Sequence, residues 1–240
     1  MRLSRFFIDA PLSLGQHTLP ETQAHYIGRV LRHAVGDAVQ LFDGSGLEYL
    51  GELIEVGKKS VRVELREVFA GLAESPLQIH LGQGLSRGER MDWAIQKACE
   101  LGANAISPIV SARCEVRLKD ERADKRMAHW RQIAISACEQ CGRSAIPLIH
   151  PPLSLADWLQ QVDAELKLVL HPVAEPLASH LKPQSLAFLI GPEGGLSESE
   201  VEQAKVAGFQ AARLGPRVLR TETAPVVALA VAQQLWGDFS

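Results

Sequence analysis

The stretch that decides the fold is LAFLIGPEGGLSESE, residues 186–200. Five apolar residues run into Gly-Pro-Glu-Gly-Gly, and Ser197 and Glu200 then fit the capping box of a helix start. The stretch predicts a buried strand over residues 186–190, a tight bend, and a helix over residues 197–207. Glycines at the carboxyl end of a strand let a ligand approach the backbone, and a helix start offers free N–H donors to an anion. The alternative is a plain tight turn.

Strands and helices alternate on both sides of this stretch, from residue 77 to the C-terminus. Hydrophobic spacing predicts further strands over residues 77–85, 105–110, 146–149, 166–170 and 211–214. It predicts further helices over residues 89–101, 122–141, 155–162 and about 224–236. This alternation indicates an α/β domain with a largely parallel sheet.

The N-terminal part has a different pattern, with short strands and tight turns. Strands are predicted over residues 38–42, 47–54 and 60–67, with one helix over residues 21–32. Such a pattern favours a small β-barrel. The small and polar residues 71–76, GLAESP, are typical of a linker. We therefore predict two domains, residues 1–72 and 73–240.

A second stretch with chemical potential is RLGPRVLRTETAPVVALAVAQQLW, residues 213–236. Arg217, Arg220 and Glu222 fall in a predicted loop between a strand and the last helix, where they form either a polar site or ordinary ion pairs of a solvated turn. Thr221 or Thr223 is expected to cap that helix. Residues 224–232 are all apolar, so the helix should be buried on every side, within the domain or partly in a subunit interface.

Charge and composition limit the function classes. The net charge is −3 over 240 residues, so any nucleic-acid surface must be a local patch. Basic residues exceed acidic ones by two within residues 1–33 and by three within residues 113–143, which suits RNA phosphates or, alternatively, an ordinary solvated face. No segment has the length and apolarity of a membrane span, and the start does not resemble a signal peptide.

Two further motifs support competing functions weakly. Cys138 and Cys141 form a CxxC pair, but no second ligand pair follows at zinc spacing, so we expect no metal. Four cysteines in a chain of this size indicate a reducing cytoplasm rather than a disulfide framework. Gly82, Gly84 and Gly88 follow a predicted strand, but their spacing departs from the dinucleotide-binding pattern. An NAD-dependent oxidoreductase is therefore a remote alternative.

Seven segments together resemble one protein family. They are RFF (5–7), HYIGRVLR (25–32), RGERMDWAIQKACELG (87–102), ACEQCGR (137–143), LHP (170–172), LIGPEGGLS (189–197) and LGPRVLRTET (214–223). In this order they resemble the ribosomal RNA small subunit methyltransferase E family, the uridine-N3 methyltransferases of 16S rRNA. The resemblance implies an N-terminal PUA-like RNA-binding barrel and a C-terminal SPOUT domain with a trefoil knot. It also implies S-adenosyl-L-methionine as cofactor, a homodimer, and 16S rRNA within the small ribosomal subunit as partner.

The resemblance also places the site residues. The implied cofactor-binding residues are Leu170, His171, Gly191, Pro192, Glu193, Gly194, Gly195, Leu214, Gly215, Val218, Leu219 and Thr223. Arg220 is the candidate for stabilising charge on the uracil oxygens, and Glu222 or Glu193 for receiving the N3 proton or orienting the base. The basic patches make RNA-binding candidates of Arg2, Arg5, Arg29, Arg32, Arg87, Arg113 and Arg143. Two alternatives stay open: a SPOUT enzyme that methylates a ribose 2′-hydroxyl, and a non-catalytic RNA-binding factor of ribosome assembly.

Overall fold

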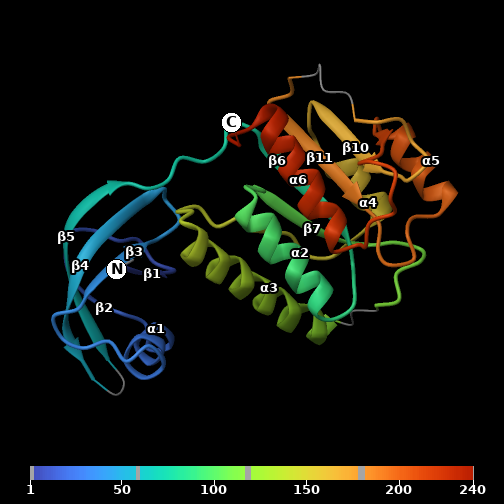
Figure 1. The fold of residues 1–240 in the computed structure, drawn as a ribbon. Coiled ribbons are helices and arrows are strands. Elements are labelled where there is room, and N and C mark those ends of the chain that lie inside the picture. Colours follow the sequence, from blue (N-terminus) through green and yellow to red (C-terminus); the bar gives the residue numbers. More distant parts are fainter. Residues whose placement is uncertain (1–2, 58–59, 117–119, 178–181, 240) are drawn as a thin grey trace. The chain divides into compact units, whose positions relative to one another are not determined.

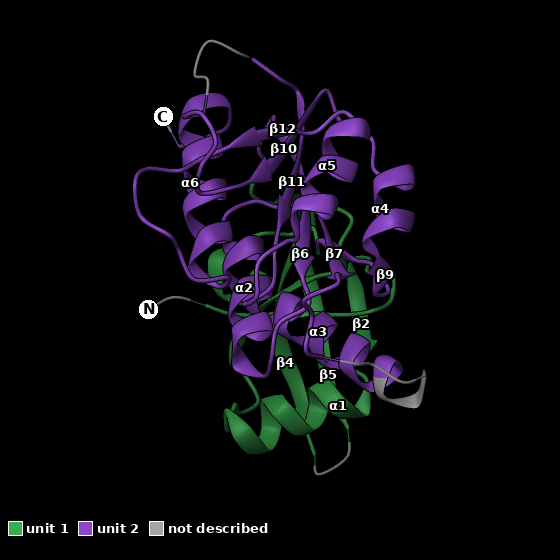
Figure 2. Cartoon of the chain, turned by 90° about the vertical axis from the view of Figure 1, so that its right-hand side faces the viewer, with its two compact units in different colours: residues 1–74, 138–146 green, residues 75–137, 147–240 purple. Residues whose placement is uncertain are grey.

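The computed structural model describes residues 3–57, 60–116, 120–177 and 182–239, with side chains left out at residues 120–122. The chain forms two compact units (Figure 2). The first comprises Met1–Glu74 and Cys138–Ile146, and the second comprises Ser75–Ala137 and Pro147–Ser240. Residues 138–146, which belong to the first unit, contain the CxxC pair. No linker-like sequence separates them from the residues of the second unit on either side.

The first unit is built on a five-stranded sheet of order β1-β3-β4-β5-β2. Its strands are β1 (Ser4–Phe7), β2 (Gly15–Thr18), β3 (Ala38–Phe42), β4 (Leu47–Val56) and β5 (Val61–Ala70). Only the β1–β3 pair is parallel. The three predicted strands are confirmed, whereas β1 and β2 escaped prediction because four residues are too few to show alternation.

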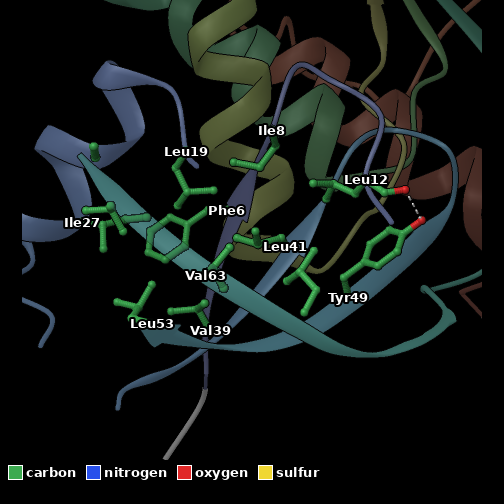
Figure 3. Close-up of a cluster of buried hydrophobic side chains, with 13 residues drawn as sticks. Phe6, Ile8, Leu12, Leu19, Ile27, Val39, Leu41, Tyr49, Leu53 and Val63 are labelled. Carbon is green, nitrogen blue, oxygen red and sulfur yellow. Dashed lines mark hydrogen bonds between the residues drawn. The ribbon is translucent and has the colours of Figure 1, made fainter. Parts of the chain in front are cut away.

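The core of the first unit lies against one face of this sheet (Figure 3). Phe6, Leu41, Leu53 and Val63 are almost fully buried there, and the Tyr49 hydroxyl donates a hydrogen bond of 2.9 Å to a backbone carbonyl oxygen. Strand β4 shifts register against β5 between Leu50 and Gly51. A Cβ on Gly51 would lie 2.6 Å from a carbonyl oxygen of β5, so the bulge requires glycine.

The helix predicted over residues 21–32 is confirmed as far as Val30, but its second half is a π-helix. Helix α1 (Glu21–His25) passes into a π-helical turn, η1 (Tyr26–Val30), in which the Leu31 N–H donates to the Tyr26 carbonyl oxygen. Ile27 lies in this wider turn and is fully buried in the core. We attribute the departure from the ordinary 3.6-residue repeat to the packing of this side chain.

The second unit contains a parallel sheet of order β12-β10-β11-β6-β7-β8, with β9 beside β7. Figure 1 labels its strands β6, β7, β10 and β11. Its strands are β6 (Gln78–Gly84), β7 (Ala105–Val110), β8 (Leu148–Ile149), β9 (Leu153–Ser154), β10 (Leu166–Leu170), β11 (Ser185–Ile190) and β12 (Gln210–Ala212). Its helices are α2 (Glu89–Glu100), α4 (Leu155–Gln161), α5 (Glu198–Val206) and α6 (Thr223–Trp236), and α3 (Asp120–Cys141) ends in the first unit. The predicted parallel α/β sheet is confirmed.

Helices cover both faces of the sheet. Helices α2 and α6 pack against each other on one face, while α4 and α5 lie on the other (Figure 1). Beneath α4 and α5, Ala187 and Leu189 of β11 share a buried cluster with Trp158. Strand β11 is therefore buried on both faces, which explains its uninterrupted apolar sequence.

The two predicted helix caps have different outcomes. At α5 the capping box is confirmed: the Glu200 N–H donates to Ser197 Oγ at 3.3 Å, and the Ser197 N–H donates to Glu200 Oε2 at 2.8 Å. At α6 the threonine cap is wrong, because Glu222 holds the cap position and makes no capping bond. Of the apolar run 224–232, five residues are buried in the chain and four, Val226, Val227, Ala230 and Val231, are partly exposed, so the alternative of a subunit interface stays open. Within the described residues, no helix has the length and apolarity to cross a membrane.

Candidate active site

The candidate site lies where three neighbouring strands end. Strands β10 and β11 are adjacent, and the chain then returns through α5 to place β12 on the other side of β10. Such a reversal leaves a crevice at the carboxyl ends of parallel strands. The loops that follow Leu170, Ile190 and Ala212 meet there around a cavity of about 650 Å³. That volume suits one organic ligand of moderate size.

Most of the predicted site residues line this one cavity. From the predicted cofactor set they are Leu170, His171, Gly191, Pro192, Glu193, Gly195, Leu214, Gly215, Val218 and Leu219. Arg220 and Glu222 line it as well. Two predicted residues are not part of the lining: Gly194, whose carbonyl oxygen instead accepts a hydrogen bond from Arg113, and Thr223.

Tight backbone contacts shape the bend after β11. A Cβ on Gly191 would lie 2.9 Å from the Leu196 nitrogen, and Gly195 has a φ of +68°. Strand β6 presses on the same bend, since a Cβ on Gly84 would lie 2.3 Å from the Pro192 nitrogen. A Cβ on Gly82 would collide with the Trp158 ring. These two β6 glycines serve close packing, so the dinucleotide-loop hypothesis loses its basis.

A buried hydrogen-bond chain joins the bend to the loop before α6. The Thr221 hydroxyl donates to the Gly191 carbonyl oxygen at 2.8 Å and accepts from Gln83 Nε2 at 3.0 Å. Ser86 Oγ lies 3.3 Å from the same hydroxyl. Thr221 therefore holds the loop before α6 at a fixed distance from the bend after β11. These hydrogen bonds constrain the two loops more than a helix cap at Thr221 would.

Arg90, on the first turn of α2, is a site residue that the sequence did not reveal. Its Nη1 donates to Glu193 Oε1 at 2.8 Å, and its Nε lies 4.0 Å from Glu222 Oε1. The Arg87 backbone N–H also donates to Glu193 Oε1, at 3.1 Å. A signal was present, because the first turn of a helix that follows a β-strand lies at the ligand-binding edge of a parallel sheet.

The two candidate carboxylates differ in their surroundings. Partial burial alone would raise the pKa of Glu193, but the hydrogen bonds from Arg90 and from backbone N–H groups outweigh it and hold that pKa below its usual value. Glu222 accepts no side-chain hydrogen bond from any described residue and lies 4.0 Å from Arg220 Nη1. Glu222 is therefore the carboxylate with lone pairs available to a ligand. Glu193 instead links the bend after β11 to the start of α2.

The cavity has a positive rim. Five arginines and two glutamates line it, in a chain whose net charge is negative. Arg113 is engaged with backbone carbonyl oxygens of the bend, and Arg90 with Glu193. Arg213 and Arg217 make no ion pair with the described part of the chain, and the Arg220 side chain is 80% exposed. The Arg213 and Arg217 guanidinium groups are thus free to meet an anionic ligand, and that of Arg220 is exposed beside Glu222 Oε1, 4.0 Å away.

Two of the arginines predicted to bind RNA are structural. Arg5 Nη2 pairs with Glu48 at 2.6 Å, and its guanidinium also donates to four carbonyl oxygens of residues 138–143. Arg143 is paired with Glu74. Both arginine side chains are only 7% exposed, so the prediction that they grip phosphates is wrong. A charge count cannot distinguish a surface arginine from one that satisfies buried acceptors.

The other basic candidates keep accessible side chains. Arg29, Arg32 and Arg113 are exposed, and Arg87 is exposed and paired with Glu115 at 2.6 Å. Arg2 lies outside the described residues. Taken with Arg213, Arg217 and Arg220, these side chains provide positive charge on each unit separately.

The CxxC pair is part of the packing of the first unit. None of the four cysteines forms a disulfide with a described residue, and Cys138 donates to the Ala145 carbonyl oxygen at 3.6 Å. A hydrogen bond with Cys138, together with burial, strongly raises the pKa of the Cys141 thiol, which disfavours a reactive thiolate. In the part of the chain that the structure describes, no cluster of histidine, cysteine or acidic side chains could hold a metal ion.

Comparison with known proteins agrees with this arrangement. The RNA methyltransferase domain family matches residues 73–233, and the RNA methyltransferase PUA domain family matches residues 19–66. Ribosomal RNA small subunit methyltransferase E of Buchnera aphidicola from Schizaphis graminum is 37% identical, over 100% of this chain and 99% of its own length. The chain belongs to the ribosomal RNA small subunit methyltransferase E family.

Other members of the methyltransferase E family support the assignment. The Bacillus subtilis protein of that name is 35% identical over 86% of this chain and 85% of its own length. The Neisseria gonorrhoeae methyltransferase E, solved bound to S-adenosyl methionine, is 41% identical with a TM-score of 0.93, and all of each chain is covered. The family assignment accounts for the SPOUT-type α/β unit and the PUA unit, while the trefoil knot stays a prediction.

Proposed function

We propose that this chain transfers the methyl group of S-adenosylmethionine to N3 of a uridine in 16S rRNA of the small ribosomal subunit. The observation that carries the proposal is the single cavity that gathers the loops after β10, β11 and β12. Membership of the methyltransferase E family and the S-adenosyl methionine complex of the Neisseria relative support both the reaction class and the cofactor.

The cavity has the features that this cofactor needs. Leu170, Leu214, Val218 and Leu219 offer apolar walls for an adenine ring. Gly191 brings bare backbone to the edge of the cavity, where a side chain would collide with its own loop. S-adenosylmethionine supplies a methyl group already activated by the sulfonium, so the protein needs no metal for this transfer.

The protein's own residues then act on the uracil. N3 is a weak nucleophile until it loses its proton, and the charge that develops spreads to the two ring oxygens. Arg220 is the exposed guanidinium best placed to stabilise that charge. Glu222, whose oxygens are not held by hydrogen bonds from described side chains, either accepts the proton or orients Arg220. N3 is hidden in a Watson–Crick pair, so the target uridine must be unpaired when it is bound.

Nucleoside analysis tests the proposed reaction. The purified protein and S-adenosylmethionine are incubated with small subunits, or with their rRNA, from cells that lack the protein. Digestion and mass spectrometry should reveal 3-methyluridine. A ribose 2′-O-methyl nucleoside would replace this proposal by the ribose alternative. Failure to bind S-adenosylmethionine in isothermal titration would favour a non-catalytic assembly factor.

Substitution of Arg220 tests the assigned role. Arg220→Ala should bind S-adenosylmethionine as the wild type does but lose about 100-fold or more in methyl transfer, the usual loss when one charge-stabilising donor is removed. Lys205→Ala is the control, because it removes an exposed basic side chain of the same unit, on α5, that does not line the cavity. Full methyl transfer by Arg220→Ala would exclude the role.

The proposal includes a homodimer in the cytoplasm. Support for the dimer comes from α6, whose apolar residues Val226, Val227, Ala230 and Val231 remain partly exposed. Light scattering coupled to size exclusion gives the mass of the assembly directly, and a monomer at micromolar concentration would argue against the dimer.

A further inference from the structure

We propose that Tyr26, Arg29 and Arg32 form a stacking site for an unpaired RNA base on the first unit. The inference rests on the proposed function for its ligand, since it needs an RNA substrate. It goes beyond that function because it assigns base recognition to a surface that lies outside the active-site cavity. We call these three residues the stacking triad.

The Tyr26 ring is exposed but held in place. It is 44% exposed, and it packs edge-on against the buried Phe6 ring with centroids 6.2 Å apart at 87°. The chain has two tyrosines, and the other, Tyr49, is buried and hydrogen-bonded. An aromatic ring of fixed orientation with a solvent-facing surface is the element on which single-stranded bases stack.

The backbone around Tyr26 is unusual in two ways. Tyr26 begins the π-helical turn η1, and such turns occur often at functional sites. Arg32, just after this turn, has a φ of +59°, and it is the one non-glycine residue with positive φ in the part of the chain that the structure describes. A left-handed arginine costs about 1 kcal/mol or more, so the surrounding structure must hold it there.

Firm contacts anchor the segment after Arg32. His33 Nδ1 lies 2.9 Å from Asp37 Oδ2, and its Nε2 lies 3.0 Å from Ser4 Oγ. The His33 ring also packs edge-on against Phe6. The same buried ring therefore fixes both Tyr26 and the end of the turn, which gives the stacking triad a rigid base.

The positive charge of the stacking triad favours RNA as its ligand. Arg29 and Arg32 are exposed and form no ion pair with any described residue. Val30 and Leu31 between them are 56% and 41% exposed. Two unpaired guanidinium groups beside an apolar and aromatic surface match a nucleic-acid strand, which presents phosphates and flat bases together.

Binding measurements on the full chain test the site. The probe is a fluorescently labelled single-stranded 16S rRNA fragment that contains the target uridine without its methyl group. It is titrated at several salt concentrations. Tyr26→Ala should weaken binding about tenfold with an unchanged salt slope, because stacking is worth roughly 1–3 kcal/mol per base. Tyr26→Phe keeps the ring and should bind like the wild type. Arg29→Gln should weaken binding and reduce the salt slope by about one.

A matched control and an RNA scan sharpen the test. Phe69→Ala removes another aromatic side chain of the same unit, 43% exposed, and should leave RNA affinity unchanged. Abasic substitutions along the RNA should reveal one position at which Tyr26→Ala has no further effect. S-adenosylmethionine affinity should be the same in every variant, because the cavity is lined by residues of the second unit. Urea denaturation curves and circular dichroism spectra that match the wild type show that the first unit of each variant is folded.

Two results would overturn the stacking triad. The first is wild-type RNA affinity of Tyr26→Ala alongside an active wild-type enzyme. The second is a change of assembly mass in Tyr26→Ala without loss of RNA affinity, which would assign the surface to a protein contact. Failure of the proposed function is a separate outcome, because the wild type itself would then neither bind S-adenosylmethionine nor methylate the RNA.

Discussion

Gly84→Ala should disable cofactor binding, although Gly84 does not line the cavity. The added Cβ would lie 2.3 Å from the Pro192 nitrogen and 2.6 Å from the Gly191 carbonyl carbon. Ordinary contact starts at 3.4 Å, so the bend after β11 must move by about 1 Å. A misplacement of about 1 Å costs about 100-fold in rate where reacting groups must be aligned, so methyl transfer should fall by at least that factor, along with cofactor affinity. Overpacking should also lower the free energy of unfolding by about 1–3 kcal/mol.

The assay is isothermal titration with S-adenosylmethionine, with urea denaturation of each variant alongside. Gly208→Ala is the matched control. Its φ of +90° makes alanine strained by about 1–2 kcal/mol, yet nothing lies within 4 Å of the new Cβ. The control should lose stability and keep cofactor affinity. Our account of the bend would be refuted if Gly84→Ala bound the cofactor normally, or if both variants lost affinity equally.

Two further predictions concern stability. Ser197→Ala removes the capping box of α5 and should lower the free energy of unfolding by about 1 kcal/mol in urea denaturation, whereas Ser199→Ala on the same helix should have little effect. Burial, together with the nearby His150, lowers the pKa of His80 from 6.5 to about 4, so the folded state keeps His80 neutral while the unfolded state takes up a proton. Stability should therefore fall by about 3 kcal/mol as pH drops from about 6.5 to 4, and His80→Gln should flatten that part of a pH series of denaturation curves.

Local patterns made much of the second unit predictable. Strand β11 could be recognised because a strand buried on both faces is apolar throughout, and the α5 capping box needs residues only three positions apart. The bend between them follows from its glycines. Most cavity residues came from the family resemblance, and the strand ends indicated independently that their loops would meet.

Features that join distant segments could not be predicted. Arg90 reaches Glu193, which is 103 positions away, and no local pattern records that pairing. Arg5 finds its acceptors at Glu48 and at residues 138–143, so its burial depends on the complete first unit. The Thr221 prediction failed for a related reason: a hydroxyl that suits a helix cap donates instead to the carbonyl oxygen of Gly191, in a different loop 30 positions away.

The hydrogen bonds that Arg5 donates to carbonyl oxygens of residues 138–143 have a consequence for biosynthesis. The first unit lacks its last segment until translation has passed Ile146, which is 72 residues beyond Glu74. At an elongation rate of about 5–20 residues per second, this leaves an interval of about 4–14 seconds. Throughout that interval Arg5 lacks its carbonyl acceptors of residues 138–143, and Glu48 lacks the hydrogen bond from the Ser144 hydroxyl. The N-terminal unit is therefore completed only after much of the catalytic unit has been synthesised, although its first residue leaves the ribosome first.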